Sequence, residues 1–162
     1  MNAPMDDDLT QLIAALEEQE RRLTFDRFDF GDAWSLGCLL VELASARELP
    51  VAIDIRRGRQ QLFHAALAGS VADNDEWIAR KVRVVERYGV SSFLVGRRLA
   101  VKGQELDAGM GVDPAEYAAH GGAFPVRVPG AGVVGVVTVS GLPQADDHAL
   151  VVEAIEELRR RG

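Results

Sequence analysis

With 162 residues, the chain has the length of one domain built around a single hydrophobic core. Its composition, with 48% hydrophobic and 27% charged residues, excludes the disordered and fibrous classes. The net charge of −7 argues against a nucleic-acid partner, because binding phosphates requires a concentrated basic surface. We therefore expect one domain over residues 1–162, with residues 1–23 as an N-terminal helical extension.

The sequence also bears on the compartment. No stretch approaches the roughly 20 apolar residues that a membrane span needs, so no membrane partner is expected. The opening residues, MNAPMDDDLTQL, lack the basic and apolar regions of a secretory signal. The single cysteine, Cys38, forms no intrachain disulfide, and its leucine neighbours predict a buried thiol. A cytoplasmic protein is the expectation.

The N-terminal third predicts two helices with a short strand between them. Apolar residues recur at helical spacing over residues 9–23, and Asp8 stands where an N-cap would be. Aromatic residues at period two favour a strand over residues 24–30. A second helix is expected to begin at a cap on Asp32 and to end at about Arg47.

A β-hairpin and a helix are predicted next. Residues 51–55 and 60–67 alternate as strands do, and Gly58 supplies the turn between them. Residues 73–76 have the spacing of a capping box, with the first aspartate as the cap. The helix that follows is expected to end at Gly89.

The C-terminal half predicts a second hairpin among helices. We expect a helix over residues 91–104, a short helix over 113–122, strands over 124–128 and 133–140, and a final helix over 143–161. Strands joined by tight turns pair antiparallel. The predicted fold class is therefore α/β (α+β), with a central antiparallel sheet and flanking helices.

One motif in this hairpin suggests a nucleotide site. Residues 130–135 satisfy G-x-G-x-x-G. In a dinucleotide fold the last glycine opens a helix that faces the pyrophosphate, whereas residues 136–139, Val-Val-Thr-Val, continue a strand. These glycines therefore indicate a turn, and P-loop, G-x-S-x-G, H-E-x-x-H and paired C-x-x-C motifs are all absent from the sequence.

Histidines and one helix entry are the first candidates for a site. His64, His120 and His148, with the nearby Asp146 and Asp147, could form a metal or haem site if the fold brings them together. At Ser140-Gly141 the chain turns into the last helix, whose free N–H groups favour a carboxylate or phosphate. The alternative is that Ser140 only organises the turn.

A second candidate lies on the helix that begins near Asp73. Asn74, Trp77 and Lys81 are spaced to share one face. An aromatic ring beside an amine can receive an anionic ring compound. The alternative is a half-buried tryptophan with Lys81 extending past it to solvent.

Several of these residues carry a resemblance to a known family. From about Leu49 to Leu158 the chain resembles the haem-degrading-domain (HbpS/GlcG-like) family, and it resembles an uncharacterised branch over nearly its full length. The matching residues are Asp73-Asn74, Trp77-Ile78, Lys81, Ser91-Ser92, His120-Gly121-Gly122, Phe124-Pro125, Val139 to Leu142 and Asp146-Asp147-His148. The resemblance implies a profilin-like fold and a ring-like homo-oligomer of dimers. It also implies haem as a cofactor to consider, because some relatives bind haem or corrinoids.

Two hypotheses about function follow. The first is a cytoplasmic, oligomeric protein that binds a small anionic or tetrapyrrole ligand such as haem. Its proposed pocket consists of Asn74, Trp77, Lys81, His120, Gly121, Ser140, Gly141 and His148. The second is an oligomeric scaffold or partner-binding protein without catalytic activity. An enzyme that uses His120 or His148 as an acid or base is a third reading, since histidine titrates near neutral pH.

Overall fold

The computed structural model describes residues 3–162 and is built around a four-stranded sheet. The strands are β1 (Ala52–Arg57), β2 (Gln60–Ala66), β3 (Ala123–Val128) and β4 (Gly132–Ser140). They lie in the order β2-β1-β4-β3, and every neighbouring pair is antiparallel. Both predicted hairpins are confirmed, and so is the strand that continues through the G-x-G-x-x-G motif.

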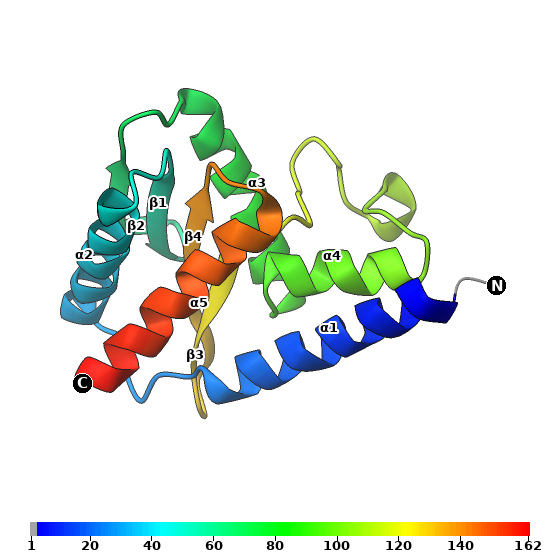
Figure 1. Cartoon of the computed structure of the whole chain (residues 1–162), viewed down its shortest axis with the longest axis horizontal. Helices are drawn as coiled ribbons and strands as arrows, with labels where there is room; N and C mark the ends of the chain where they lie inside the picture. Colours follow the sequence, from blue (N-terminus) through cyan, green and yellow to red (C-terminus); the bar gives the residue numbers. More distant parts are fainter. Residues whose placement is uncertain (1–2) are drawn as a thin grey trace.

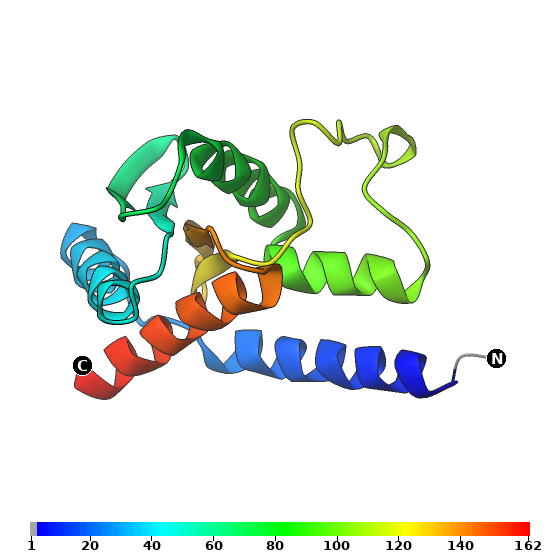
Figure 2. The ribbon, with the colours of Figure 1, turned by 45° about the horizontal axis from the view of Figure 1, so that its top comes forward.

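Helices cover both faces of this sheet (Figures 1 and 2). They are α1 (Ala3–Arg22), α2 (Phe30–Ala46), α3 (Ala72–Tyr88), α4 (Ser92–Val101) and α5 (Gln144–Arg161). Helices α2 and α5 pack on one face over the main core, and α3 packs on the other. Helix α1 runs alongside α4 in both views. The predicted antiparallel sheet with flanking helices is confirmed.

Three predicted helix starts are wrong. Helix α1 already includes Asp8, because it begins at Ala3. Helix α2 is capped by Asp29, whose carboxylate accepts the Asp32 N–H, so Asp32 lies one turn inside the helix. Helix α3 begins at Ala72 rather than after a cap at Asp73. In each case several acidic residues lie close together, and residue type alone does not select the one with extended backbone that a cap requires.

Two other predicted elements are also wrong. Residues 24–30 do not form a strand; Phe25 makes a single backbone bond to β3, from its N–H to the Arg127 carbonyl, and its ring packs edge-on against Phe28. The helix expected at 113–122 is only one turn, closed by bonds to the Asp113 carbonyl. Segments this short form too few hydrogen bonds to be fixed by their own sequence.

The prediction that the Cys38 thiol is buried is wrong, because Cys38 is exposed in the structure. Its leucine neighbours do point into the core, but Cys38 lies one turn beyond the exposed Trp34 on the outer side of α2. Over the described residues, no helix combines the length and the apolar character that crossing a membrane requires.

Candidate functional site

A buried ion pair lies where α3, β4 and α5 meet. Lys81 is only 3% exposed, and its Nζ lies 3.2 Å from Asp147 Oδ2 and 3.2 Å from the carbonyl oxygen of Val139. Burial lowers the pKa of Lys81 and raises the pKa of Asp147, while the attraction between the two charges opposes both shifts. The other oxygen of Asp147 accepts the Leu142 N–H. The pair therefore ties α3 to the entry of α5.

The glycines around this pair are required by close packing. Gly122 has φ +137°, and a Cβ there would overlap the Val139 carbonyl and the Lys81 amine. Gly141 has φ +146°, and a Cβ there would overlap the carbonyl of Pro50. The space beside the backbone at Gly141 is thus occupied by the Pro50 carbonyl. Ser140 is buried at the end of β4.

His120 lies beside this junction, with its ring tilted against the ring of Trp77. The two ring centroids are 5.2 Å apart, and the guanidinium of Arg80 lies 4.6 Å from the Trp77 ring centroid. Partial burial lowers the pKa of His120, and the positive charges of Lys81, Arg80 and Arg97 lower it further, against a weaker opposing effect of Glu105. At neutral pH the imidazole is therefore uncharged, and its nitrogen is available as a ligand.

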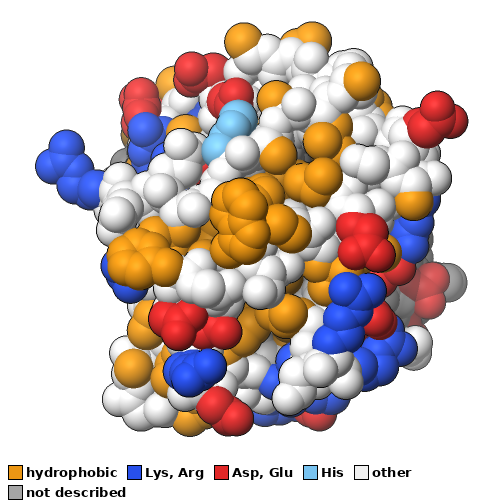
Figure 3. Space-filling view, turned by 90° about the vertical axis from the view of Figure 1, so that its left-hand side faces the viewer, with side chains coloured by type: hydrophobic (Ala, Val, Ile, Leu, Met, Phe, Trp, Pro, Cys, Tyr) orange, Lys and Arg blue, Asp and Glu red, His pale blue; other side chains and the backbone are white. Residues whose placement is uncertain are grey.

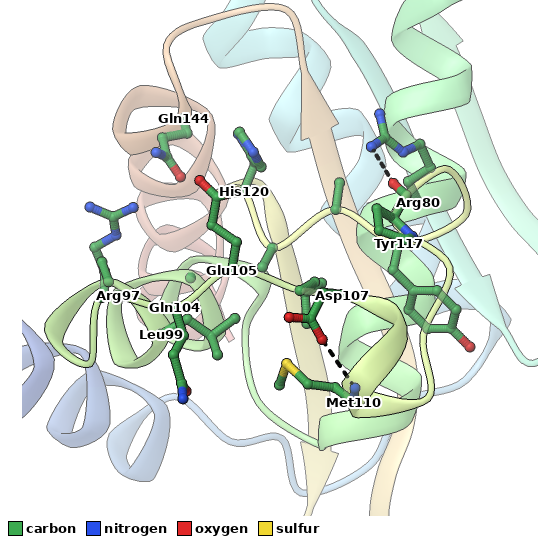
Figure 4. A pocket seen from close by; sticks show the side chains of 17 residues that line it. Arg80, Arg97, Leu99, Gln104, Glu105, Asp107, Met110, Tyr117, His120 and Gln144 are labelled. Carbon is green, nitrogen blue, oxygen red and sulfur yellow. Dashed lines mark hydrogen bonds between the residues drawn. The ribbon is translucent and has the colours of Figure 1, made fainter.

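An open pocket of about 1110 Å³ adjoins His120. Its walls come from Arg80 on α3, Arg97 on α4, the loop between α4 and β3, and Gln144 at the start of α5. In Figure 4, Arg97 and Gln144 lie to one side of His120, and Arg80 and Tyr117 lie to the other. Gln144 also accepts the Gly121 N–H at 3.0 Å through its side-chain oxygen, which fixes the chain next to His120.

The pocket contains unpaired cationic groups. Among the described residues, four buried side-chain atoms have no hydrogen-bond partner, and two of them are the Nε atoms of Arg80 and Arg97. Arg80 donates from Nη2 to the Pro114 carbonyl, and the Arg97 guanidinium lies over the Phe93 ring. Of the acidic residues in the lining, Asp107 already accepts a backbone N–H from Met110. Neither arginine has an ion-pair partner among the described residues, and a guanidinium group without one favours an anion.

Two residues of the sequence-predicted site lie elsewhere. The side chain of Asn74 accepts the Val71 N–H at the start of α3. His148 is buried, with its Nε2 2.7 Å from Gln19 Oε1 and its ring against Phe93 and Phe124. Its burial lowers the pKa to about 4. The structure thus brings Trp77, Lys81, His120, Gly121, Ser140 and Gly141 to one region, without Asn74 and His148.

The histidines do not converge. His64 lies on β2 and bonds to Asp75 on α3 at 2.7 Å, whereas His120 borders the pocket and His148 is in the core. Within residues 3–162, no group of three or more His, Cys, Asp or Glu side chains could hold a metal ion. The sequence reasoning missed Arg80, Arg97 and Gln144. Arg80 follows Trp77 by one helical turn, so the sequence could have placed it on the same helix face. No comparable sequence pattern indicates Arg97.

Comparison with known proteins identifies the family. The family described as haem degrading protein HbpS-like matches residues 28–156. The chain belongs to the HbpS-like family. This HbpS-like chain is 67% identical to the UPF0303 protein SCO2848 of Streptomyces coelicolor, over 89% of this chain and 91% of the relative. It is 49% identical to a UPF0303 protein of Acidobacterium capsulatum, over 91% of this chain and 89% of that one.

Solved structures of other proteins have a similar fold. The Ybr137w protein superposes with a TM-score of 0.84 at 34% identity, over 92% of this HbpS-like chain and 88% of that protein. HbpS itself gives a TM-score of 0.64 at 18% identity, over 83% of this chain and 92% of that one. The structure of a PduOC–haem complex gives 0.67 at 18%, over 80% and 93%. The latter two similarities support the fold, and the resemblance seen in the sequence is confirmed.

Proposed function

We propose that the protein binds a small anionic ligand in the pocket between α3, α4 and α5, and that a tetrapyrrole carrying carboxylates, such as haem, is the first candidate. The observation that carries this proposal is that two arginines, Arg80 and Arg97, line the pocket and form no ion pair within the described residues. Guanidinium groups bind carboxylates through strong, charge-assisted hydrogen bonds. A ligand carboxylate would supply the counter-charge that these two guanidinium groups lack.

Other features of the pocket fit this class of ligand. Its volume of about 1110 Å³ is slightly above the usual range for small-molecule pockets, so it leaves room for a large ring compound. His120 presents an uncharged imidazole at the edge, which is the group that holds haem iron in many proteins. The PduOC structure is a haem complex on a related fold, which supports testing haem before other anions.

The proposal is tested by titrating the protein with haemin and following the Soret band. We expect a shift at micromolar haemin. Replacing Arg97 with alanine should weaken binding by roughly 10- to 100-fold, which corresponds to losing one charge-assisted hydrogen bond. His120→Phe should preserve the ring contact with Trp77 while removing the imidazole nitrogens. It should weaken haemin binding but leave binding of the metal-free dicarboxylate porphyrin unchanged.

The matched control is Arg98→Ala. Arg98 is the next residue on α4, but it pairs with Glu17 on α1, away from the pocket. Its loss should leave the titration unchanged. An unchanged Soret band at micromolar haemin would reject the tetrapyrrole, and equal effects of the Arg97 and Arg98 variants would reject the pocket.

The scaffold hypothesis placed Trp77 and His120 in contacts between subunits. In the structure His120 is exposed and Trp77 is half-buried, and this hypothesis stays a prediction. Self-association and a cytoplasmic location remain predictions from the sequence.

A further inference from the structure

The chain between α4 and β3 forms a long irregular segment beside the pocket. Residues 103–119, which we call the strap, contain one turn of 3₁₀ helix (Ala108–Met110) and one further turn that begins at Asp113. In Figure 2 this segment loops out from the end of α4 before the chain returns to the sheet. Ordered loops of this length are uncommon in compact domains, and they commonly serve as lids or binding loops.

Three arginines of α3, spaced at i, i+3 and i+7 on one face of the helix, donate hydrogen bonds to main-chain carbonyls of the strap. The bonds run from Arg80 to Pro114 (2.9 Å), from Arg83 to Glu116 (2.9 Å), and from Arg87 to Met110 (3.2 Å) and Gly111 (3.3 Å). In the other direction, the Ala118 N–H donates to the Arg80 carbonyl. These bonds replace the backbone partners that an irregular segment lacks.

The strap forms one wall of the pocket. Asp107, Met110 and Tyr117 of the strap line it, and so do Arg97 on α4 and Gln144 on α5. In Figure 4 the three strap side chains lie across the view from Arg97 and Gln144. A ligand in the pocket therefore lies between the strap on one side and helices α4 and α5 on the other.

The strap has few other contacts that hold it in place. Val112 and Ala118 are its only buried residues, and its bonds to the arginines of α3 are exposed to solvent. Its first residue, Gly103, has left-handed backbone (φ +65°), and no atom lies within 4 Å of the position that a Cβ would take. The chain just beyond its other end is fixed, because the Gly121 N–H bonds to Gln144. Few buried contacts and solvent-exposed hydrogen bonds are typical of a segment that opens locally while the rest of the domain stays folded.

We propose that the strap is a movable wall of the pocket, that Arg80, Arg83 and Arg87 hold it closed, and that this hold sets how fast a bound ligand leaves. The inference rests on the proposed function, because it takes the pocket as the ligand site. Arg80 belongs to both parts, since it bonds to the strap and lines the pocket. Arg83 and Arg87 do not line the pocket, so any effect of theirs on a ligand must pass through the strap. A ligand that contacts the strap in turn favours the closed arrangement.

The hold on the strap is measured without ligand, through a thiol that the closed strap buries. Ala118→Cys places this thiol, because Ala118 is only 3% exposed. Cys38 is exposed on α2, at the side of the molecule that Figure 3 shows, and Cys38→Ser removes its competing reaction. In this background Arg87→Met should raise the rate of alkylation by iodoacetamide about tenfold, because the strap loses two bonds to a charged donor.

Arg83→Met should have a similar effect, since it also removes a bond to a strap carbonyl. The matched control is Arg98→Met, because Arg98 pairs with Glu17 and has no bond to the strap. Hydrogen exchange of the Ala118 amide, which bonds to the Arg80 carbonyl, gives the same comparison in a chain without the added cysteine. Rates that are equal in the Arg87 and Arg98 variants by both methods overturn the proposal.

Haemin dissociation tests whether the strap controls escape from the pocket. When dissociation is timed by transfer to excess apomyoglobin, haemin should leave Arg83→Met and Arg87→Met about tenfold faster than wild type, in proportion to the more frequent opening. It should leave Arg98→Met at the wild-type rate. A normal Soret shift with unchanged dissociation rates overturns the role of the strap alone. A wild type without a Soret shift rejects the proposed function, and the role of the strap in ligand escape with it.

Discussion

Replacing Lys81 with methionine is expected to destabilise the protein by about 3–5 kcal/mol, the range for breaking a buried ion pair by removing one partner. The methionine fills the space of the lysine stem but leaves the Asp147 carboxylate without its counter-ion. Asp147 is as buried as Lys81, and solvent cannot replace the lost charge. Urea unfolding followed by circular dichroism gives the free energy of unfolding directly.

The double variant Lys81→Met/Asp147→Asn should recover most of this loss. Asparagine removes the unpaired charge, and its side-chain oxygen can still accept the Leu142 N–H. The control is Arg21→Met, which breaks an exposed pair with Glu18 and should cost less than about 1 kcal/mol. A double variant no more stable than the single one would show that the charge of Asp147 is not the source of the loss.

A loss of stability in the Lys81→Met variant would also change the role assigned to Lys81 in the candidate site. The sequence suggested an amine beside Trp77 that could bind an anion, whereas the structure pairs that amine with Asp147. Lys81 therefore acts on the pocket through the positive charge that it contributes near His120. Loss of ligand binding in a Lys81 variant should be interpreted only after the fraction of folded protein has been measured.

The sequence predicted those helices and strands in which one hydrophobic periodicity extends over a long segment. The hairpins and the helices α3 and α5 follow from alternation, helical spacing and glycine turns, as at Gly89, whose left-handed backbone ends α3. The Asp73 cap was wrong because Asn74 accepts the Val71 N–H from inside the first turn. Asparagine can serve as an N-cap or can accept a backbone N–H from inside the first turn, and only the backbone path decides between these two roles.

The candidate site was predicted in part. Trp77 and His120 were placed in the same predicted pocket, and in the structure their rings are in contact. Arg97 could not be found, because it reaches the pocket only through the packing of α4 against the chain near Ala119. That packing depends on Gly96, where a Cβ would overlap the Ala119 carbonyl. Such a contact joins residues far apart in sequence and leaves no local periodic signal.

Lowering the pH from about 6.5 to about 4 is expected to remove about 3 kcal/mol of stability through His148 alone. The folded state holds its pKa at about 4, below the ordinary value of 6.5, so the unfolded chain binds the proton more tightly. The contribution is complete above pH 6.5 and is lost as the pH falls towards 4. The cause is burial: Nδ1 has no partner, and Phe93 and Phe124 surround the ring.

His148→Gln isolates this contribution, because glutamine can still bond to Gln19 but does not titrate. Carboxylates also titrate in this range, so the informative quantity is the difference in unfolding free energy between variant and wild type, measured by urea unfolding at intervals from pH 7 to 4. That difference should shift by about 3 kcal/mol in favour of the variant as the pH falls. A constant difference between His148→Gln and wild type would mean that His148 binds its proton equally well in the folded and unfolded chains.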